Sequence, residues 1–446
     1  MGPDGIRRWA LLLLVLAAIP DVLPYAGLKT LIGERFGKSD AETQLFAVAA
    51  LLGALLAVPL LRSLRRKSPR RVFAIAALVQ AFSVALMALP VSWEFLLTLR
   101  AVQGGADLLT LVTLTTVVAS HARGTGRGFG ASGSAVLFGL AIGLAGGGVI
   151  SSLAPLAVFP LCAMVSLVMA LAATGLPALH VATQRPTQQR RFDRQIIMGG
   201  AFAASDRMIS GMMTVSLPLL LVATMGLSES MIGAILAAPL LACAVGGFFS
   251  GMLIDRIGGL LGRAVGVPLQ AVGLGLIVLS AGHAGLLISG TVLMAAGATI
   301  LLPTSMVIGT SRRTDQVEVD AVGGIQAIGQ GGHLFGVLLI SMLTVLAGQV
   351  TALGVLAILG GYVLWNAIFL YSLGGQSAST PRPGPQFAMA NRQLIGPRPA
   401  RTLRSRTVLI EPLVDTYDGP RSSPNPKVVE EECPSTNTNA SKTVSS

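Results

Sequence analysis

Long apolar runs, separated by short polar stretches, follow one another along most of this chain. Each run is about as long as the roughly 20 residues that an α-helix needs to cross a bilayer. Charged positions gather between the runs, as expected when each helix satisfies its own backbone hydrogen bonds in lipid. The pattern predicts an all-α polytopic membrane protein with twelve transmembrane helices, at residues 9–32, 44–61, 72–92, 95–119, 129–150, 155–176, 196–224, 230–252, 264–282, 285–309, 321–347 and 351–374.

The composition points the same way. Hydrophobic residues make up 52% of the 446 positions and charged residues 12%, whereas soluble proteins carry about 25% charged residues. A water-soluble enzyme is therefore excluded, and so is disorder over most of the chain. From residue 376 the sequence becomes rich in Pro, Ser, Thr and Arg without an apolar period, which predicts a disordered cytoplasmic tail at 376–446.

Positive charge alternates between the connections. Lys and Arg accumulate in cytoplasmic loops, so we expect both termini in the cytoplasm and the protein in the cytoplasmic (inner) membrane. The first run is expected to be a retained helix and not a signal peptide, because eleven runs follow it. The net charge of +12 then mainly reflects Lys and Arg in cytoplasmic loops and does not indicate nucleic-acid binding. The most basic connection, between the second and third runs, contains Arg62, Arg65, Arg66, Lys67, Arg70 and Arg71.

The two halves of the chain echo each other. Asp21 lies in the first run and Asp206 in the seventh, and a short polar connection and a long apolar run follow each. This repetition predicts two pseudo-symmetric six-helix bundles with a binding site between them, near the bilayer midplane. The expected division is an N-terminal bundle at 1–176, a cytoplasmic central loop at 177–195, a C-terminal bundle at 196–375 and the tail.

Three short motifs carry more specific chemistry. A loop between the eighth and ninth runs combines glycines for close helix approach with charges that can form a latch. An arginine inside the fourth run is costly in lipid and is by default a candidate functional residue, unless it reaches out to the membrane surface. The fifth run holds a glycine face for close packing. The motif residues are Gly251, Leu253, Asp255, Arg256, Gly258 and Arg263 in the loop, Leu97, Arg100, Gln103, Gly104 and Ala106 in the fourth run, and Gly139, Gly143, Gly147 and Gly148 in the fifth.

These motifs resemble those of the major facilitator superfamily. The resemblance implies a secondary transporter, with a gating role for the loop and proton coupling for Arg100. The fifth-run motif is similar to that of proton-coupled exporters, although Leu144 stands where the family has proline. The matching loop at residues 59–67 lacks the glycine and aspartate of the family pattern.

Few polar residues lie inside the runs, and they form stripes at helical spacing. Because lipid offers them no partners, they must face protein or water. Asp21 and Asp206 are candidate proton carriers, with Arg100 or Arg207 as switching partners; the alternative is a permanent charge pair that holds helices together. His333 titrates in a useful range but is also compatible with simple packing. The stripes are Asp21, Tyr25 and Lys29; Arg100, Gln103, Asp107 and Thr110; Asp206, Arg207 and Ser210; and Gln326, Gln330 and His333.

The sequence therefore predicts a monomeric transporter that moves a small molecule by alternating access, with proton-coupled export as the preferred mode. Its expected partners are the substrate, protons and the lipid bilayer. No metal, cofactor or hydrolase motif is present in the sequence, so neither a cofactor nor enzymatic activity is expected. Two alternatives remain: an importer of an anion, a sugar or a metal chelate, and a non-transporting assembly or scaffold protein of the same fold.

Overall fold

The computed structural model describes residues 2–64, 67–122, 125–176, 194–225, 227–280, 283–310, 319–347 and 352–379. Residues 1–380 belong to one compact unit. Several predicted features lie outside the described residues, namely Arg65 and Arg66 of the basic connection, most of the central loop and the tail from residue 380. The long helices are α1 (Pro3–Val22), α3 (Leu45–Leu56), α5 (Pro69–Met87), α6 (Trp93–Ser120), α7 (Thr125–Leu153), α8 (Val158–Ala172), α9 (Arg194–Met225), α10 (Glu229–Ile257), α11 (Gly259–Leu279), α12 (Ala284–Thr310), α13 (Val319–Ala347) and α14 (Ala352–Ser379).

Helices account for every predicted apolar run. Within the described residues, eight helices are long and apolar enough to cross a membrane. Their outward faces carry large exposed apolar side chains such as Phe82, Leu153 and Leu171, which lipid would cover. The last helix continues to Ser379, beyond the predicted boundary at residue 375.

The first predicted span is not a single helix. The helix α1 ends at Val22, a turn follows, and a π-helix runs from Lys29 to Glu34. Pro24 lies in this turn, and its ring lacks the N–H that a continuing helix requires. The second predicted span is also broken, because α3 is followed by the short helix α4 (Val58–Leu64) with Pro59 in its first turn. The stripe of Asp21, Tyr25 and Lys29 therefore does not lie on one regular helix.

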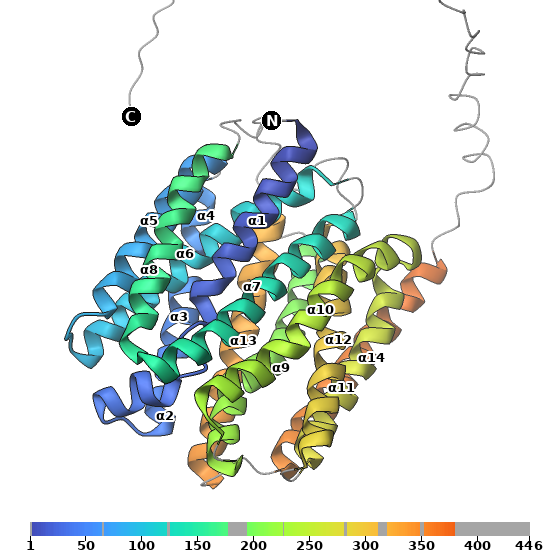
Figure 1. The fold of residues 1–446 in the computed structure, drawn as a ribbon. Helices are drawn as coiled ribbons and strands as arrows, with labels where there is room; N and C mark the ends of the chain where they lie inside the picture. Colours follow the sequence, from blue (N-terminus) through green and yellow to red (C-terminus); the bar gives the residue numbers. More distant parts are fainter. Residues whose placement is uncertain are drawn as a thin grey trace, which may run out of the picture. The chain divides into compact units, whose positions relative to one another are not determined.

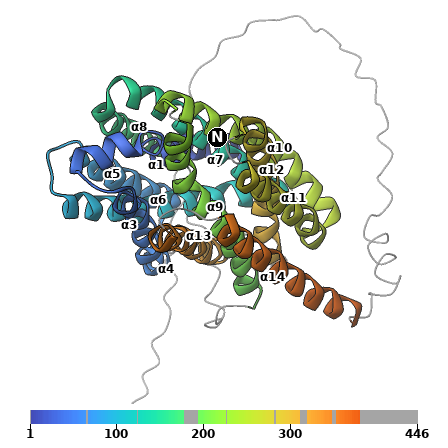
Figure 2. The same ribbon diagram turned by 90° about the horizontal axis from the view of Figure 1, so that it is seen from below.

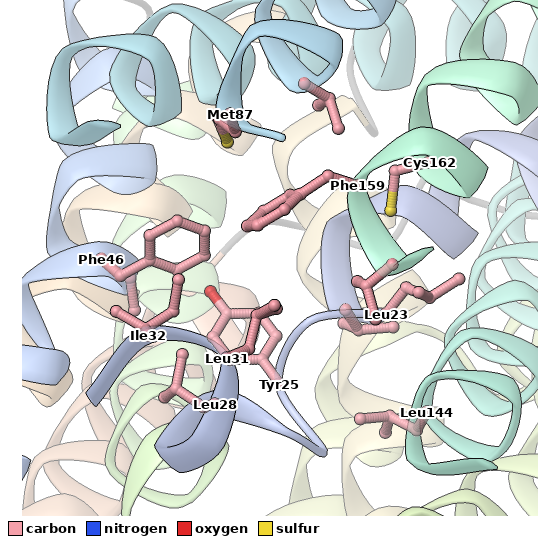
Figure 3. Packing of buried hydrophobic residues seen from close by; sticks show 14 of the residues in the cluster. Leu23, Tyr25, Leu28, Leu31, Ile32, Phe46, Met87, Leu144, Phe159 and Cys162 are labelled. Atoms are coloured by element: carbon pink, nitrogen blue, oxygen red, sulfur yellow. The ribbon is translucent and has the colours of Figure 1, made fainter. Parts of the chain in front are cut away.

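The broken segment is nevertheless firmly packed. Leu23, Tyr25 and Leu28 of the turn region are buried with Phe46 of α3 and Phe159 of α8, as Figure 3 shows. The same cluster extends to Ala237 of α10 and to Leu334 and Val337 of α13. It therefore joins helices from both halves of the chain.

A pair of long helices, α7 and α10, forms the most extensive contact between the halves. In Figure 1 the helices α3, α5 and α8 lie on one side and α11, α12 and α14 on the other, with α7 and α13 between them. Figure 2 shows the same grouping from below. A further buried cluster joins Leu61 of α4 and Val112 of α6 to Ala321 and Ile325 of α13. The halves thus meet through apolar packing in at least two places.

Candidate functional site

The arginine of the fourth apolar run lies in a charged cluster of the first half. The helix α6 begins after Ser92, whose hydroxyl accepts a hydrogen bond from the backbone N–H of Phe95 (3.3 Å). Arg100 follows about two turns later and is fully buried. Its position excludes the alternative in which it reaches the membrane surface.

Arg100 binds the end of the broken first helix. Its Nη2 donates to Oδ1 of Asp21 (3.3 Å), to the backbone oxygen of Asp21 (3.2 Å) and to the hydroxyl of Tyr25 (3.2 Å). Its Nη1 donates to Oε1 of Gln103 (2.8 Å), and the guanidinium lies over the ring of Phe46, 4.7 Å from the centroid. A helix end leaves carbonyl groups unpaired and favours a cation, so the break after Val22 helps to create this site.

This cluster is incompletely satisfied. The Nε of Arg100 is buried and has no hydrogen-bond partner. The side chain of Asp21 is 38% exposed, whereas that of Arg100 is 1% exposed. The carboxylate of Asp21 therefore binds a buried arginine and is also accessible to water.

The second half contains a corresponding pair with a different partner from the expected one. Arg263 donates from Nη1 to Oδ2 of Asp206 (2.9 Å) and from Nη2 to Oδ1 (2.7 Å), which is a bidentate ion pair. We expected Arg263 in the gating loop and Arg207 beside Asp206. Instead Gly258, with φ +83°, ends α10 and α11 starts at once, so that Arg263 lies inside a helix and points into the bundle.

Each of the three guanidinium nitrogens of Arg263 donates at least one hydrogen bond. The Nε of Arg263 donates to Oδ1 of Asn366 (2.7 Å), Nη2 also donates to Ser205 (3.0 Å), and the guanidinium stacks 3.9 Å from the ring centroid of Phe202. The hydroxyl of Tyr362 lies 3.1 Å from Oδ1 of Asp206.

Sequence reasoning missed the polar partners on α11 and α14. Gln270, Tyr362 and Asn366 are buried polar residues within apolar runs, where every polar residue needs a partner. That signal was present in the sequence. The identity of the partners was not, because it depends on how α9, α11 and α14 pack together.

The loop motif contacts the other half of the chain. The carboxylate of Asp255, at the end of α10, accepts hydrogen bonds from the backbone N–H groups of Gly126 (2.8 Å) and Arg127 (3.0 Å). These residues start α7, so an acidic group caps a helix N-terminus from across the interface. Gly126 is needed here, because a Cβ would lie 2.7 Å from Oδ1 of Asp255. Gly251, one helical turn before Asp255, packs against Gly126 and Gly130 of α7. Arg256, the next residue after Asp255, is exposed.

The glycine face of α7 serves two neighbours. Gly139, Gly143 and Gly147 lie against the backbone of α1 and of the turn that follows it, at Val15, Ile19 and Leu23. Gly148 instead lies against Glu229 and Gly233 of α10. The face therefore supports both the first bundle and the contact between the halves.

The remaining predicted site residues lie on α6, α9, α13 and the π-helix. Arg207 of α9 donates a hydrogen bond from Nη2 to Oε1 of Gln326 on α13. Gln330 and His333 are half-buried on the same helix, and Gly211 of α9 packs directly on the backbone of His333. Lys29 is exposed at the start of the π-helix, so it does not join either ion-pair cluster.

Comparisons with known proteins agree with this architecture. Residues 10–205 match the family model described as Major Facilitator Superfamily. The structure is similar to that of a variant of the nucleoside transporter NupG, with a TM-score of 0.62 and 15% identity over 82% of this chain and 99% of that one. The chain has the major facilitator fold.

A second solved structure supports the same conclusion. The proton:xylose symporter XylE, bound to 6-bromo-6-deoxy-D-glucose, gives a TM-score of 0.67 and 14% identity over 83% of this chain and 95% of that one. No curated protein sequence matches this chain. The resemblance to the major facilitator superfamily and the all-α, multi-pass membrane fold class are thereby confirmed. Both solved structures are those of transport proteins.

Proposed function

We propose that this major facilitator protein is a proton-coupled secondary transporter that exports a small molecule by alternating access. The observation that carries the coupling is the state of Asp21. Its carboxylate is partly exposed and is held by a single 3.3 Å side-chain contact to a buried arginine. A proton carrier needs both a charged form that a partner stabilises and a route to water.

Arg100 supplies the partner in this proposal. When Asp21 is charged, the guanidinium holds it against the end of α1. When Asp21 takes a proton, Arg100 keeps Gln103 and Tyr25 but loses its counter-charge, and a buried unpaired charge is costly. Protonation would therefore favour a rearrangement of the broken segment that links α1 to the π-helix.

The loop of the C-terminal half supports alternating access. Asp255 joins α10 to the start of α7 through two backbone hydrogen bonds. Opening this face of the protein would break both bonds, so they stabilise the closed form. We place this latch, and both chain termini, on the cytoplasmic side of the inner membrane, following the distribution of Lys and Arg.

Export is proposed because the glycine motif of α7 resembles that of proton-coupled exporters. Import is the second candidate, since Leu144 replaces the proline of that motif and a helix without proline lacks the corresponding kink. The residues proposed to line the substrate cavity are Tyr25, Lys29, Gln103, Gln326, Gln330 and His333.

The decisive experiment measures proton movement in proteoliposomes. With an imposed pH gradient, Asp21→Asn should abolish gradient-driven transport and preserve exchange of substrate across the membrane. Asp21→Glu, which keeps the carboxylate, should retain part of the coupling. Arg100→Lys keeps the charge but loses the planar fork, and it should weaken coupling as well. Gradient-driven transport by Asp21→Asn at the wild-type rate would contradict the proposal, and the direction of the gradient that drives accumulation decides between export and import.

A further inference from the structure

Unpaired positive charge gathers at the end of the first half where α1 and α5 begin. Among the described residues, none of these basic side chains forms an ion pair. The first turn of α1 contains one acidic residue and that of α5 contains none. The protein itself therefore leaves most of this charge uncompensated. This basic patch consists of Arg7 and Arg8 in α1, Lys67 before α5, and Arg70 and Arg71 in the first turn of α5.

Packing brings the members of the basic patch to one end of the protein. Ile6 of α1 and Phe73 of α5 are buried in the same apolar cluster as Leu176, which follows α8. The indole Nε1 of Trp9 donates a hydrogen bond to the backbone oxygen of Ala172 (3.1 Å), the last residue of α8. Figure 1 shows the start of α1 and the end of α8 at the same end of the molecule. The charges of α1 and α5 therefore flank the end of α8.

The exposed arginines of the basic patch continue apolar stripes on the outside of the protein. Arg71 lies one turn before Ile75 and on the same helix face as Phe82, and all three side chains are exposed. Arg8 likewise lies one turn before Leu12, which is also exposed. Side chains four residues apart share a helix face and lean toward the helix N-terminus. Each arginine therefore lies where a lipid-covered stripe reaches the membrane surface.

The corresponding connection of the second half is built differently. There Asp255 lies beside Arg256, binds the start of α7 and pairs with Arg127. The next arginine, Arg263, is fully buried in its ion pair with Asp206. A preference of Lys and Arg for one side of the membrane applies to both halves. It does not explain why only the first half places unpaired arginines at the ends of lipid-facing stripes.

The geometry points to a binding surface for the headgroups of anionic phospholipids at this end of the first half. The phosphate oxygens would accept charge-assisted hydrogen bonds from the guanidinium groups of Arg8 and Arg71. The acyl chains of the same lipids would cover Leu12 and Ile75 below them. Trp9 lies between the two arms of the patch, at the depth where amphipathic indole rings are enriched in membrane proteins. This surface does not depend on which molecule the protein transports.

Fluorescence quenching of Trp9 by brominated phospholipids tests this surface in the full-length protein. The chain has three tryptophans, so Trp93→Phe together with Trp365→Phe leaves Trp9 as the single fluorophore. The protein is reconstituted into vesicles of phosphatidylcholine and phosphatidylglycerol, with bromine on the acyl chains of one lipid or the other. At equal mole fractions, brominated phosphatidylglycerol should quench Trp9 more strongly, because the basic patch enriches this lipid nearby. High salt should reduce the preference, since it screens exposed charges.

Charge-neutral variants assign the preference to the patch. Arg8→Gln and Arg71→Gln should each lower the relative affinity for phosphatidylglycerol about fivefold, because one basic residue near an anionic surface contributes that much. Both side chains are exposed and unpaired among the described residues, so the variants should fold. Arg194→Gln removes an exposed arginine from the start of α9 in the second half. It is the matched control and should keep the wild-type preference at Trp9.

A second fluorophore tests whether the preference is local. Trp93 starts α6, whereas Val118, near the other end of that helix, belongs to the cluster that contains Ile6. A protein with Trp93 as its single tryptophan therefore reports the opposite end of the first half and should show no preference for phosphatidylglycerol.

Four results would overturn the inference. They are equal quenching of Trp9 by both lipids, an equal preference at Trp93, a preference that survives loss of both Arg8 and Arg71, and an equal loss in the Arg194 variant. Inorganic phosphate separates lipid from a soluble source of the same chemistry. Millimolar phosphate should leave the preference intact; loss of the preference would show that the patch binds free phosphate and not a lipid.

Discussion

Each half of the molecule pairs one buried arginine with one aspartate, but the two pairs are built differently. In the second half, Arg263 makes two short bonds to Asp206, and the side chains are 0% and 10% exposed. In the first half, Arg100 makes one 3.3 Å side-chain contact to Asp21, whose side chain is 38% exposed. The Nε of Arg100 has no hydrogen-bond partner, whereas the Nε of Arg263 donates a hydrogen bond to Asn366.

In the proposed function, this difference separates a pair that holds α9, α11 and α14 together from a pair that rearranges when Asp21 takes a proton. In the second pair every guanidinium nitrogen has a partner and both side chains are almost fully buried, so the pair favours one packing of α9, α11 and α14. The first pair has an unpaired guanidinium nitrogen and a partly exposed carboxylate, the features on which the proposed proton carriage rests. The two aspartates occupy corresponding runs, the first and the seventh, whereas their arginines do not, because Arg100 lies in the fourth run and Arg263 immediately precedes the ninth.

The largest expected effect tests this comparison directly. Asp206→Asn leaves Arg263 buried without its counter-charge, and breaking such a pair costs about 3–5 kcal/mol of stability. Asp21→Asn also removes the counter-charge of a buried arginine, but its carboxylate is partly exposed and screened by solvent, so the loss of stability should be smaller. Thermal unfolding of the two variants in the same detergent measures the difference. Equal losses of stability would show that the two pairs contribute equally to the folded state.

A smaller effect is expected at the latch, where Asp255 binds the start of α7 and forms a partly exposed 3.9 Å ion pair with Arg127. Asp255→Ala removes the acceptor for the start of α7, and loss of a helix cap costs about 0.5–2 kcal/mol. The closed form should lose population accordingly. Spin labels at Ser120 and Leu261, both exposed, would then report a longer distance.

The matched control for the latch is Leu253→Ala, on the same helix turn and exposed. It should leave the distance distribution unchanged. A variant of Asp255 with the wild-type distribution would mean that the apolar contacts of α7 and α10 alone hold this face closed.

The smallest effect lies outside the membrane-spanning segments, at the short helix α2 (Asp40–Thr43). Glu42 accepts hydrogen bonds from the backbone N–H of Ser39 (3.0 Å) and from its hydroxyl (2.9 Å), and Ser39 accepts one from the N–H of Glu42. This reciprocal arrangement is a capping box. The bonds from Ser39, and then the charge of Lys38, lower the pKa of the Glu42 carboxyl below its usual range.

A lowered pKa in the folded state gives this contribution a definite pH dependence. It is complete above the ordinary carboxyl pKa of about 4.3 and is lost as the pH falls through the lower folded value. Glu42→Gln should therefore reduce Tm slightly at neutral pH, and the difference from the wild type should vanish in acid. A difference that persists or grows in acid would contradict the capping role.

Most of the fold was predictable because transmembrane helices follow local rules. Apolar runs of about 20 residues predicted the spans, because a helix of that length crosses the bilayer and pairs its own backbone groups. Pro24 and Pro59, which mark the two helix breaks, are visible in the sequence but lie inside long apolar runs. Hydropathy is averaged over many residues, so it does not detect one missing backbone N–H.

The sequence by itself determined that these helices carry few charges, where each one lies along its helix, and that the family resembled is the major facilitator superfamily. Only the tertiary structure decided which charges meet. It paired Asp206 with Arg263 and not with the neighbouring Arg207, which donates a hydrogen bond to Gln326 instead. Position along one helix follows from a fixed period of 3.6 residues, whereas a partner on another helix depends on how side chains from several helices fill the space between them.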